Sequence, residues 1–123
     1  MLEKLSHCRT GARKCWKRQG VQFWSLRIWR KTDVWTEDCS IVMSNMHLMA
    51  ASLGLGSCWI QGRLREAENG QTADAYCREL LQVPDGYALE AILSVGVPLE
   101  HPEPHRAEEL AAEKVHYETW TTQ

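Results

Sequence analysis

The longest stretch of the chain without a helix-breaking residue covers residues 36–53. Thr36 can cap the start of a helix there, and Glu37 and Asp38 would lie in its first turn, where the positive end of the helix dipole attracts carboxylates. Gly54 follows directly, and glycine readily adopts the positive φ found just beyond a helix end. The pattern therefore predicts one long helix over this stretch.

Apolar side chains are predicted on two opposite sides of this helix. The first stripe contains Val42, Met46, Met49 and Leu53, broadened by Met43 and Ala50, and the second contains Ile41, Leu48 and Leu55. A helix on the surface of a globular domain has one apolar stripe and a charged back, but no Lys, Arg, Asp or Glu follows Asp38 within this helix. We therefore expect it to be covered on both sides, either inside a larger domain or between subunits.

Strands are predicted before and after the long helix. Loose alternation of apolar and polar residues favours a strand over residues 21–28. Residues 56–60 predict a short buried strand, which leads into the loop Gln61–Arg63. His47 lies on the long helix between its apolar stripes, and we expect it to be a hydrogen-bonded imidazole of a core or interface rather than a catalytic group.

The second half of the chain predicts a further helix and strand. Residues 73–81 form a helix whose core side contains Ala73, Cys77, Leu80 and Leu81. Residues 88–97 form a strand, with Leu89, Ala91, Leu93 and Val95 on one face and Ala88, Glu90, Ile92 and Ser94 on the other. Beyond them we expect a short acidic helix over residues 107–113 and a terminal strand or arm over residues 115–120.

Length and composition indicate an ordinary globular domain. With 123 residues, 44% of them hydrophobic and 24% charged, the chain is one domain at most. No apolar run approaches the roughly 20 residues of a membrane-spanning helix, and the first residues lack the apolar core of a secretory signal, so we expect a cytoplasmic protein. The five cysteines form no C-x-x-C pair and therefore favour reduced, mostly buried thiols over a metal site.

The charge is distributed unevenly along the chain. Residues 1–31 carry nine of the 14 lysines and arginines, whereas their acidic side chain is Glu3. This segment also contains Trp16, Trp24 and Trp29. A basic, tryptophan-rich arm can bind anionic partners, but the segment has no motif of a nucleic-acid-binding module, and we expect no specific nucleic-acid partner and no membrane partner.

Three segments together resemble the FMN-dependent nitroreductase family. Residues 35–60, with Trp35-Thr36-Glu37-Asp38-Cys39-Ser40-Ile41, Asn45-Met46-His47-Leu48 and Leu53-Gly54-Leu55-Gly56-Ser57-Cys58-Trp59-Ile60, resemble that family's central helix and the strand after it. Glu90-Ala91-Ile92-Leu93-Ser94-Val95-Gly96-Val97-Pro98 resembles its next core strand, and Glu113-Lys114-Val115-His116-Tyr117-Glu118 its terminal arm. The order and spacing agree across about 85 residues.

The resemblance implies a fold, a cofactor and a chemistry. The fold is α+β, with an antiparallel-rich sheet flanked by helices and a long central helix at the interface of a homodimer. The expected activity transfers hydride from NAD(P)H to FMN and then reduces a small-molecule acceptor such as a nitroaromatic or a quinone. Because the cofactor carries that chemistry, the resemblance implies no catalytic side chain and no metal.

The loop after the short strand is the family's contact with the flavin ring, and in this chain it is formed by Trp59, Ile60, Gln61 and Gly62. By resemblance, the backbone N–H of Gln61 would face flavin N5, and Gly62 would let the backbone approach closely. A basic residue beyond the strand end touches the FMN phosphate in the family. Arg106, with His105 beside it, is the candidate for that role here.

The chain also departs from the family pattern. The Arg-rich motif that grips the FMN phosphate in the N-terminal half of the family has no counterpart, so we expect a partial copy of the fold that binds FMN weakly or not at all. We divide the chain into an atypical basic segment, residues 1–32, and a nitroreductase-like half-domain, residues 33–123. A shifted reading frame over residues 13–31 would explain their load of Trp and Arg. The alternative function is a non-catalytic remnant that binds anionic partners through its basic arm.

Overall fold

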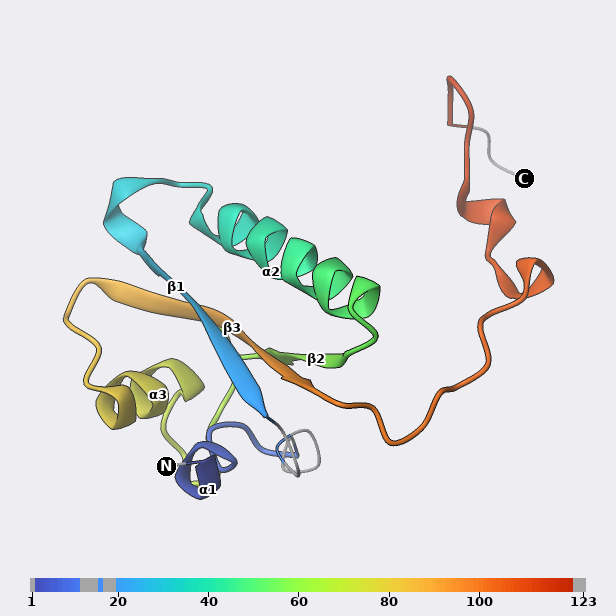
Figure 1. Cartoon of the computed structure of the whole chain (residues 1–123). Helices are drawn as coiled ribbons and strands as arrows, with labels where there is room; N and C mark the ends of the chain where they lie inside the picture. The colour runs from blue at the N-terminus through green and yellow to red at the C-terminus, as the bar shows by residue number, and fades with distance from the viewer. Residues whose placement is uncertain (1, 12–15, 17–19, 121–123) are drawn as a thin grey trace.

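A computed structural model of the chain describes residues 2–11, 16 and 20–120. Within these residues it contains one antiparallel sheet in the order β1-β3-β2, whose strands are Val21–Ile28, Tyr87–Gly96 and Gly56–Gln61 respectively. Helix α2, Trp35–Ser52, covers one face of this sheet, and α1, Leu2–Leu5, and α3, Ala73–Leu81, lie on the other (Figure 1). The α+β class with an antiparallel sheet flanked by helices is therefore confirmed.

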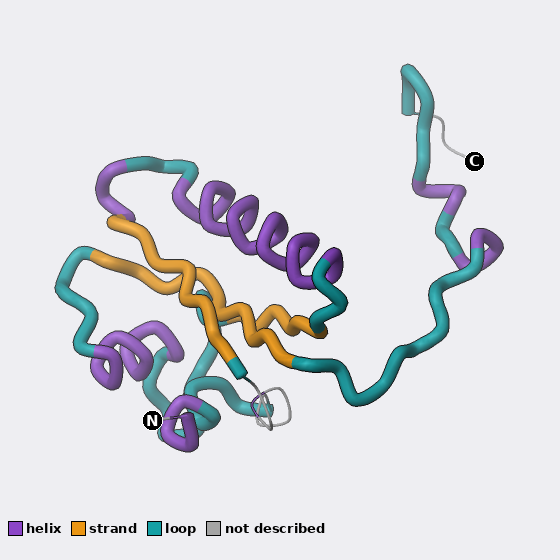
Figure 2. Tube along the Cα trace, viewed as in Figure 1, coloured by secondary structure: helices purple, strands orange, loops and turns teal. Residues whose placement is uncertain are grey.

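Two apolar clusters fill the spaces on the two faces of the sheet. The cluster on the α2 side consists of Met43, Ala50, Ala91, Leu93 and Val95. The cluster on the α1 and α3 side consists of Leu5, Cys8, Trp16, Ile60, Cys77, Leu89 and Ile92. The central strand β3 pairs with β1 on one side and β2 on the other and contributes to both clusters; Figure 2 shows the three strands of the sheet below α2. Burial on both faces explains why its sequence is an almost continuous apolar run.

A bulge in β3 changes which side chains share a face. Ser25 of β1 pairs with Ala91, but the next residue, Leu26, pairs with Leu89, so Glu90 is an extra residue in the ladder. Such an insertion breaks strict alternation. Leu89 consequently lies in the same cluster as Ile92, and the predicted face that combined Leu89 with Ala91 is wrong.

The N-cap of the long helix lies two residues before the predicted cap, Thr36. The N-cap residue is Val34, whose carbonyl accepts a 3.0 Å hydrogen bond from the Asp38 N–H. Thr36 therefore lies inside the first turn, and its hydroxyl donates to the Glu37 carboxylate at 2.7 Å instead of capping the helix. This hydrogen bond is the largest cause of the lowered pKa of Glu37. The predicted C-terminal signal is confirmed, because Gly54 has φ +71° directly after the C-cap.

Helix α2 packs on the sheet through one side, which includes part of the first predicted apolar stripe. Cys39, Met43 and Ala50 are its buried residues, with Met46 partly buried beside them. Among the other members of the two predicted stripes, Ile41, Val42, Leu48, Met49 and Leu53 are exposed in the single chain, whereas Leu55 is partly buried against the same cluster. The single chain thus covers only one side of the helix. His47 is part-buried and shares a 2.5 Å hydrogen bond with the Ser57 hydroxyl, as expected of an interior imidazole.

The basic segment takes part in the core. Residues 21–28 form the predicted strand and pair with β3 along its length. Trp16 is buried, and its ring centroid lies 6.3 Å from that of Trp24. Arg27 forms a 3.2 Å ion pair with Asp38. These aromatic rings are therefore used for packing rather than for stacking on bases. Residues 12–15 and 17–19 of the segment lie outside the described part of the chain.

The chain beyond β3 leads away from the body of the molecule (Figure 1). The predicted helix over residues 107–113 is wrong: η3, Ala107–Glu109, and η4, Ala112–Lys114, are two separate 3-10 turns. Residues 115–120 form no strand and run as an arm. Both results have the same physical cause, since short helices and single strands need packing partners, and this segment is almost wholly exposed.

Candidate functional site

The candidate site lies at the end of β2, which is an edge strand. The side chains of Trp59 and Ile60 point to opposite faces of the sheet, as alternation requires. Trp59 packs against the cluster under α2, whereas Ile60 is 1% exposed in the cluster under α3. Only the backbone of Ile60 is therefore available to a ligand. Within the described residues, no group of three His, Cys, Asp or Glu side chains could hold a metal ion, and no helix is long and apolar enough to cross a bilayer.

The backbone N–H of Gln61 faces away from the sheet. Gln61 lies opposite Ala91 in the antiparallel ladder, and the next residue, Gly62, donates its N–H to the Glu90 carbonyl at 3.0 Å. Hydrogen-bonded and non-hydrogen-bonded pairs alternate in such a ladder. Because Gly62 and Glu90 form a bonded pair, Gln61 and Ala91 form an unbonded one. The Gln61 N–H therefore points outward along the free edge of β2.

Position 62, directly after Gln61, requires a glycine because the main chain lies very close to β3 there. A Cβ atom at this position would lie 2.6 Å from Cδ2 and 2.9 Å from Cγ of Leu89. Real side chains do not approach so closely. The structure therefore gives an intrachain reason for this glycine, in addition to the close approach of a ligand that the sequence suggested.

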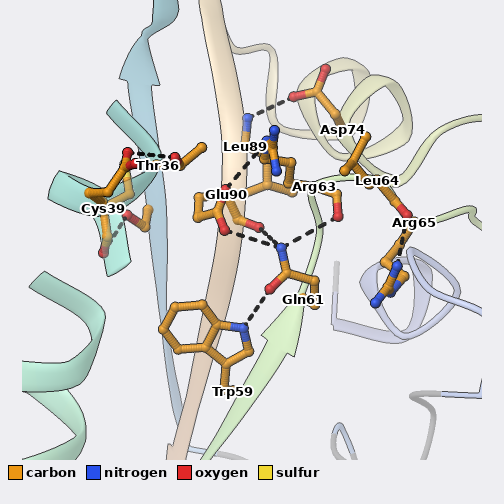
Figure 3. A network of polar contacts seen from close by, with 12 residues as sticks. Thr36, Cys39, Trp59, Gln61, Arg63, Leu64, Arg65, Asp74, Leu89 and Glu90 are labelled. Carbon is orange, nitrogen blue, oxygen red and sulfur yellow. Dashed lines mark hydrogen bonds and ion pairs between the residues drawn. The ribbon is translucent and has the colours of Figure 1, made fainter. Parts of the chain in front are cut away.

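A network of hydrogen bonds holds the side chain of Gln61. The Trp59 indole donates to its Oε1 at 2.9 Å, and its Nε2 donates to Oε1 of Glu90 at 3.1 Å and to the Glu90 carbonyl at 3.3 Å. Figure 3 shows these bonds running from Trp59 through Gln61 to Glu90. Both the acceptor and the donors of the amide have partners, so the side chain is drawn back against β3 and away from the outer edge.

Glu90 is the residue of this network that the sequence analysis did not single out. It is 6% exposed, occupies the bulge of β3, and lies 3.9 Å from the Nε of Arg63. The Arg63 guanidinium is also 5.8 Å from the ring centroid of Trp35, at the start of α2. A signal was present in the sequence, since Glu90 is the one charged residue in the apolar run over residues 87–96.

The bulge itself is held from two sides. The Asp74 carboxylate on α3 accepts a 2.7 Å hydrogen bond from the Leu89 N–H. On the other side, the N–H groups of Gly62 and Arg63 both donate to the Glu90 carbonyl, at 3.0 and 2.9 Å. The loop after β2 is therefore fixed to the central strand at its first two residues.

The structure does not bring His105 and Arg106 to this loop within the single chain. Gly96, the last residue of β3, pairs with Gly56 at the start of β2, whereas Gln61 is at the other end of that strand. The arm that carries His105 and Arg106 thus leaves from the far end of the sheet. Both residues contact Glu109 instead: the His105 Nδ1 lies 3.1 Å from its carboxylate, and the Arg106 N–H donates to it at 3.4 Å.

An open groove lies between β1 and α2. Its volume is about 520 Å³, and it is lined by Phe23, Trp24, Ser25, Leu26, Arg27, Asp38, Cys39, Ile41, Val42 and Met46. Most of these side chains are apolar, and the groove continues into the exposed side of α2. The surface is therefore suited to packing against protein rather than to binding a polar ligand.

Comparison with known proteins shows that the chain resembles nitroreductases in both sequence and fold. The sequence model of the nitroreductase family matches residues 30–97, which include β2, β3 and the loop between Gln61 and Arg63. The solved structure of an FMN-dependent nitroreductase from Clostridium difficile R20291 has a TM-score of 0.87 and 40% identity, over 98% of this chain and 72% of that one. A second structure, from Parabacteroides distasonis, shares the fold with a TM-score of 0.81 at 22% identity, over 97% of this chain and 67% of that one.

A curated relative comes from Archaeoglobus fulgidus and is provisionally named an NADH dehydrogenase/NAD(P)H nitroreductase. It is 30% identical over 89 residues, which are 72% of this chain and 48% of that protein. The chain thus spans about half the length of this curated relative.

Proposed function

Because this chain belongs to the nitroreductase family, as its match over residues 30–97 shows, we propose that it acts in an FMN-dependent NAD(P)H oxidoreductase. In the proposed reaction, hydride from NAD(P)H reduces FMN, and the electrons then pass to a small acceptor such as a nitroaromatic or a quinone. The names of the relatives from Clostridium difficile and Archaeoglobus fulgidus support FMN and NAD(P)H as the cofactor and co-substrate.

The observation that carries the proposal is the outward backbone N–H of Gln61. Proteins bind the edge of a flavin ring through hydrogen-bond donors and its face through groups that stack on the ring. The outer edge of β2 offers backbone N–H donors that the Gln61 side chain does not cover. The Gln61 amide is drawn back by Trp59 and Glu90, which leaves that edge open. The residues present therefore fit the edge of a flavin ring.

The chain contributes positioning rather than acid, base or nucleophile. When bound, FMN supplies the hydride and electron transfer. Gln61 would donate its backbone N–H to the ring, Gly62 would keep the backbone close to β3, and Trp59 would hold the Gln61 side chain in place. Ile60 would act through its backbone, because its side chain is buried.

We infer further that this chain alone binds FMN weakly. Recognition of a phosphate group normally uses several charge-assisted hydrogen bonds, each contributing about 1.5–3 kcal/mol. Of the cations near the loop, Arg63 is already 3.9 Å from the Glu90 carboxylate, and Arg65 donates to the backbone carbonyl of the residue before it at 3.0 Å. His105 and Arg106 are on the arm that leaves from the other end of the sheet. Among the residues that the structure describes, the loop therefore offers ring contacts without a phosphate clamp.

A homodimer would supply what the single chain lacks. The exposed apolar residues of α2, which include Ile41 and Leu48, support assembly across this helix. Beside them, the groove against β1 offers further apolar surface. In such an assembly the arm of one subunit, with its His105 and Arg106, could reach the loop of the other. The phosphate contact would then come from the partner subunit.

The proposal is tested by titrating FMN into the ¹⁵N-labelled full chain and following every backbone amide by NMR. This method detects binding even when the dissociation constant is millimolar. The proposal expects the Gln61 and Gly62 amides to shift progressively as FMN is added. Riboflavin, which lacks the phosphate, should shift the same two amides. Shifts confined to other residues, with the loop unmoved, would contradict the proposed site.

A further inference from the structure

Glu90 is an exception within its own strand. Residues 89–95 are all buried, and Glu90 is the one that carries a charge. Burial removes a carboxylate from water, and the loss is recovered only if the group is paired and fully hydrogen-bonded. The energetics of packing alone would therefore favour an apolar residue here, such as those on either side of it.

The hydrogen bonds of Glu90 are incomplete within the described residues. Its Oε1 accepts from the Gln61 amide at 3.1 Å. Its Oε2 is buried and has no hydrogen-bond partner, and its distance of 3.9 Å from the Arg63 Nε is an ion-pair distance rather than a hydrogen bond. Replacing such a buried carboxylate by an apolar residue of similar volume that packs well is often neutral or stabilising. Glu90 thus gives the folded chain no gain in stability, and packing gives no reason for a carboxylate at this position.

We propose that Glu90 is a positioning residue of the flavin loop, which acts by fixing the side chain of Gln61 and, through it, the outward backbone N–H. This inference rests on the function proposed above. The Gln61 Nε2 lies within hydrogen-bond distance of the Glu90 carboxylate at 3.1 Å, of the Glu90 carbonyl at 3.3 Å and of the Arg63 carbonyl at 3.4 Å, while the Trp59 indole donates to the amide oxygen. The side chain therefore spans from Trp59 to Glu90 and reinforces the outward direction of the Gln61 N–H, which the pairing of β2 with β3 sets.

The placement of Glu90 on the bulge explains how it reaches Gln61. As the extra residue of the ladder, Glu90 has no partner on β1, so its side chain is not part of the regular alternation with that strand. Its backbone carbonyl is bound by Gly62 and Arg63, which are the two residues after Gln61. One residue of β3 thus contacts three successive residues of the loop.

The test compares Glu90→Val with Glu90→Gln in the full chain. Valine has nearly the volume of glutamate, and its side chain cannot accept a hydrogen bond from Gln61, although the backbone carbonyl at position 90 remains. Glutamine keeps a side-chain acceptor oxygen and removes the charge. Ile92→Val is the matched control, because it also alters a buried residue of β3 but does not touch Gln61. The first measurement uses protein without FMN: the indole N–H resonance of Trp59, assigned by its loss in Trp59→Phe, and the thermal midpoint.

The proposal predicts that Glu90→Val shifts the Trp59 indole resonance and speeds its hydrogen exchange, with a thermal midpoint equal to or above that of the native chain. Its affinity for FMN, read from the loop amide shifts, falls about tenfold, which corresponds to about 1.4 kcal/mol. In Glu90→Gln the Trp59 indole resonance and the affinity for FMN are expected to be near the native values. Ile92→Val is expected to change neither the resonance nor the affinity.

Two results would overturn it. A Glu90→Val chain that unfolds or melts well below the native chain would show that Glu90 serves the fold. A native-like Trp59 resonance and FMN affinity in Glu90→Val would show that Gln61 is held without it. Failure of the proposed function is recognised separately, because the native loop amides would then not respond to FMN, whatever the Trp59 resonance does in the variants.

Discussion

Gly62 lies against Leu89 so closely that a Cβ atom on the glycine would be 2.6 Å from the leucine Cδ2. Leu89 is 1% exposed and cannot swing into solvent. The glycine therefore brings the flavin loop onto the central strand, where Glu90 can bind it.

Gly62→Ala is expected to destabilise the chain by about 1–3 kcal/mol, because it overpacks a closed core. Leu89→Ala alone should cost about 2–5 kcal/mol by leaving a cavity. The double variant should cost clearly less than the sum, since the new methyl group occupies part of that cavity. Urea unfolding measures all three. Gly20→Ala is the control and should be mild, because the nearest atom that a Cβ there would meet among the described residues is the Val95 carbonyl oxygen at 3.8 Å. Strict additivity would mean that the two residues do not compete for space.

Two threonines that both precede or begin helices should differ in their effect on stability. The Thr72 hydroxyl accepts from the Ala75 N–H at 3.1 Å and caps α3, so Thr72→Ala should cost about 1 kcal/mol. Thr36 does not cap α2, and Thr36→Ala should change the stability by less than about 0.5 kcal/mol. Equal losses in thermal unfolding would show that Thr36 caps the helix after all.

The exposed side of α2 should control assembly. Leu48 is 68% exposed, so Leu48→Glu should leave the fold of the single chain intact while it weakens the proposed homodimer by placing a charge in an apolar contact. Leu64→Glu is the control, because Leu64 is 78% exposed but lies in the loop after β2. Sedimentation velocity at micromolar concentration distinguishes the species. A native chain that sediments as a monomer would contradict the proposed dimer.

The purified chain should be nearly colourless. Without a phosphate clamp, the dissociation constant for FMN is expected to be roughly millimolar, about a thousandfold weaker than a micromolar site. Visible absorbance after removal of free FMN by gel filtration gives the bound fraction, and the FMN-dependent nitroreductase of Clostridium difficile R20291 serves as the positive control. A stoichiometric yellow complex would show that the chain holds the phosphate by groups that we have not identified.

The sequence predicted the elements of this fold better than their details. The strand over residues 21–28, the helix over 73–81 and the glycine end of α2 follow from periodicity and from local chemistry, and the structure contains all of them. The bulge at Glu90 could not be predicted, because it depends on the register of β1 against β3. The first predicted stripe of α2 included Met43, Met46 and Ala50, which do pack on the sheet. Its other members, Val42, Met49 and Leu53, are exposed, because the sheet selects which apolar side chains it covers.

The candidate site shows the same division. Trp59, Gln61 and Gly62 were identified through resemblance, and the structure brings them together at one strand end. Their support by Glu90 depends on a side-chain contact between two residues that are 29 positions apart. The available signal was a charged residue inside an apolar strand. It indicated that Glu90 has a special role, but it did not indicate that Gln61 is its hydrogen-bond partner.

The most direct measurement compares Gln61→Pro with Gln61→Ala. Both variants lose the side-chain network, but only proline also removes the backbone N–H. Because that N–H points away from the sheet, proline at this edge position breaks no ladder hydrogen bond and should be tolerated by the fold. Circular dichroism and the thermal midpoint verify this.

With FMN added at millimolar concentration, NAD(P)H oxidation and the loop amide shifts report on the site. Our account predicts that the affinity for FMN and the FMN-supported rate both fall at least about tenfold further in Gln61→Pro than in Gln61→Ala, the loss of one hydrogen bond of about 1.4 kcal/mol or more. Equal losses in two folded variants would mean that the side chain of Gln61, and not its backbone N–H, contacts the cofactor, and the central claim would be wrong.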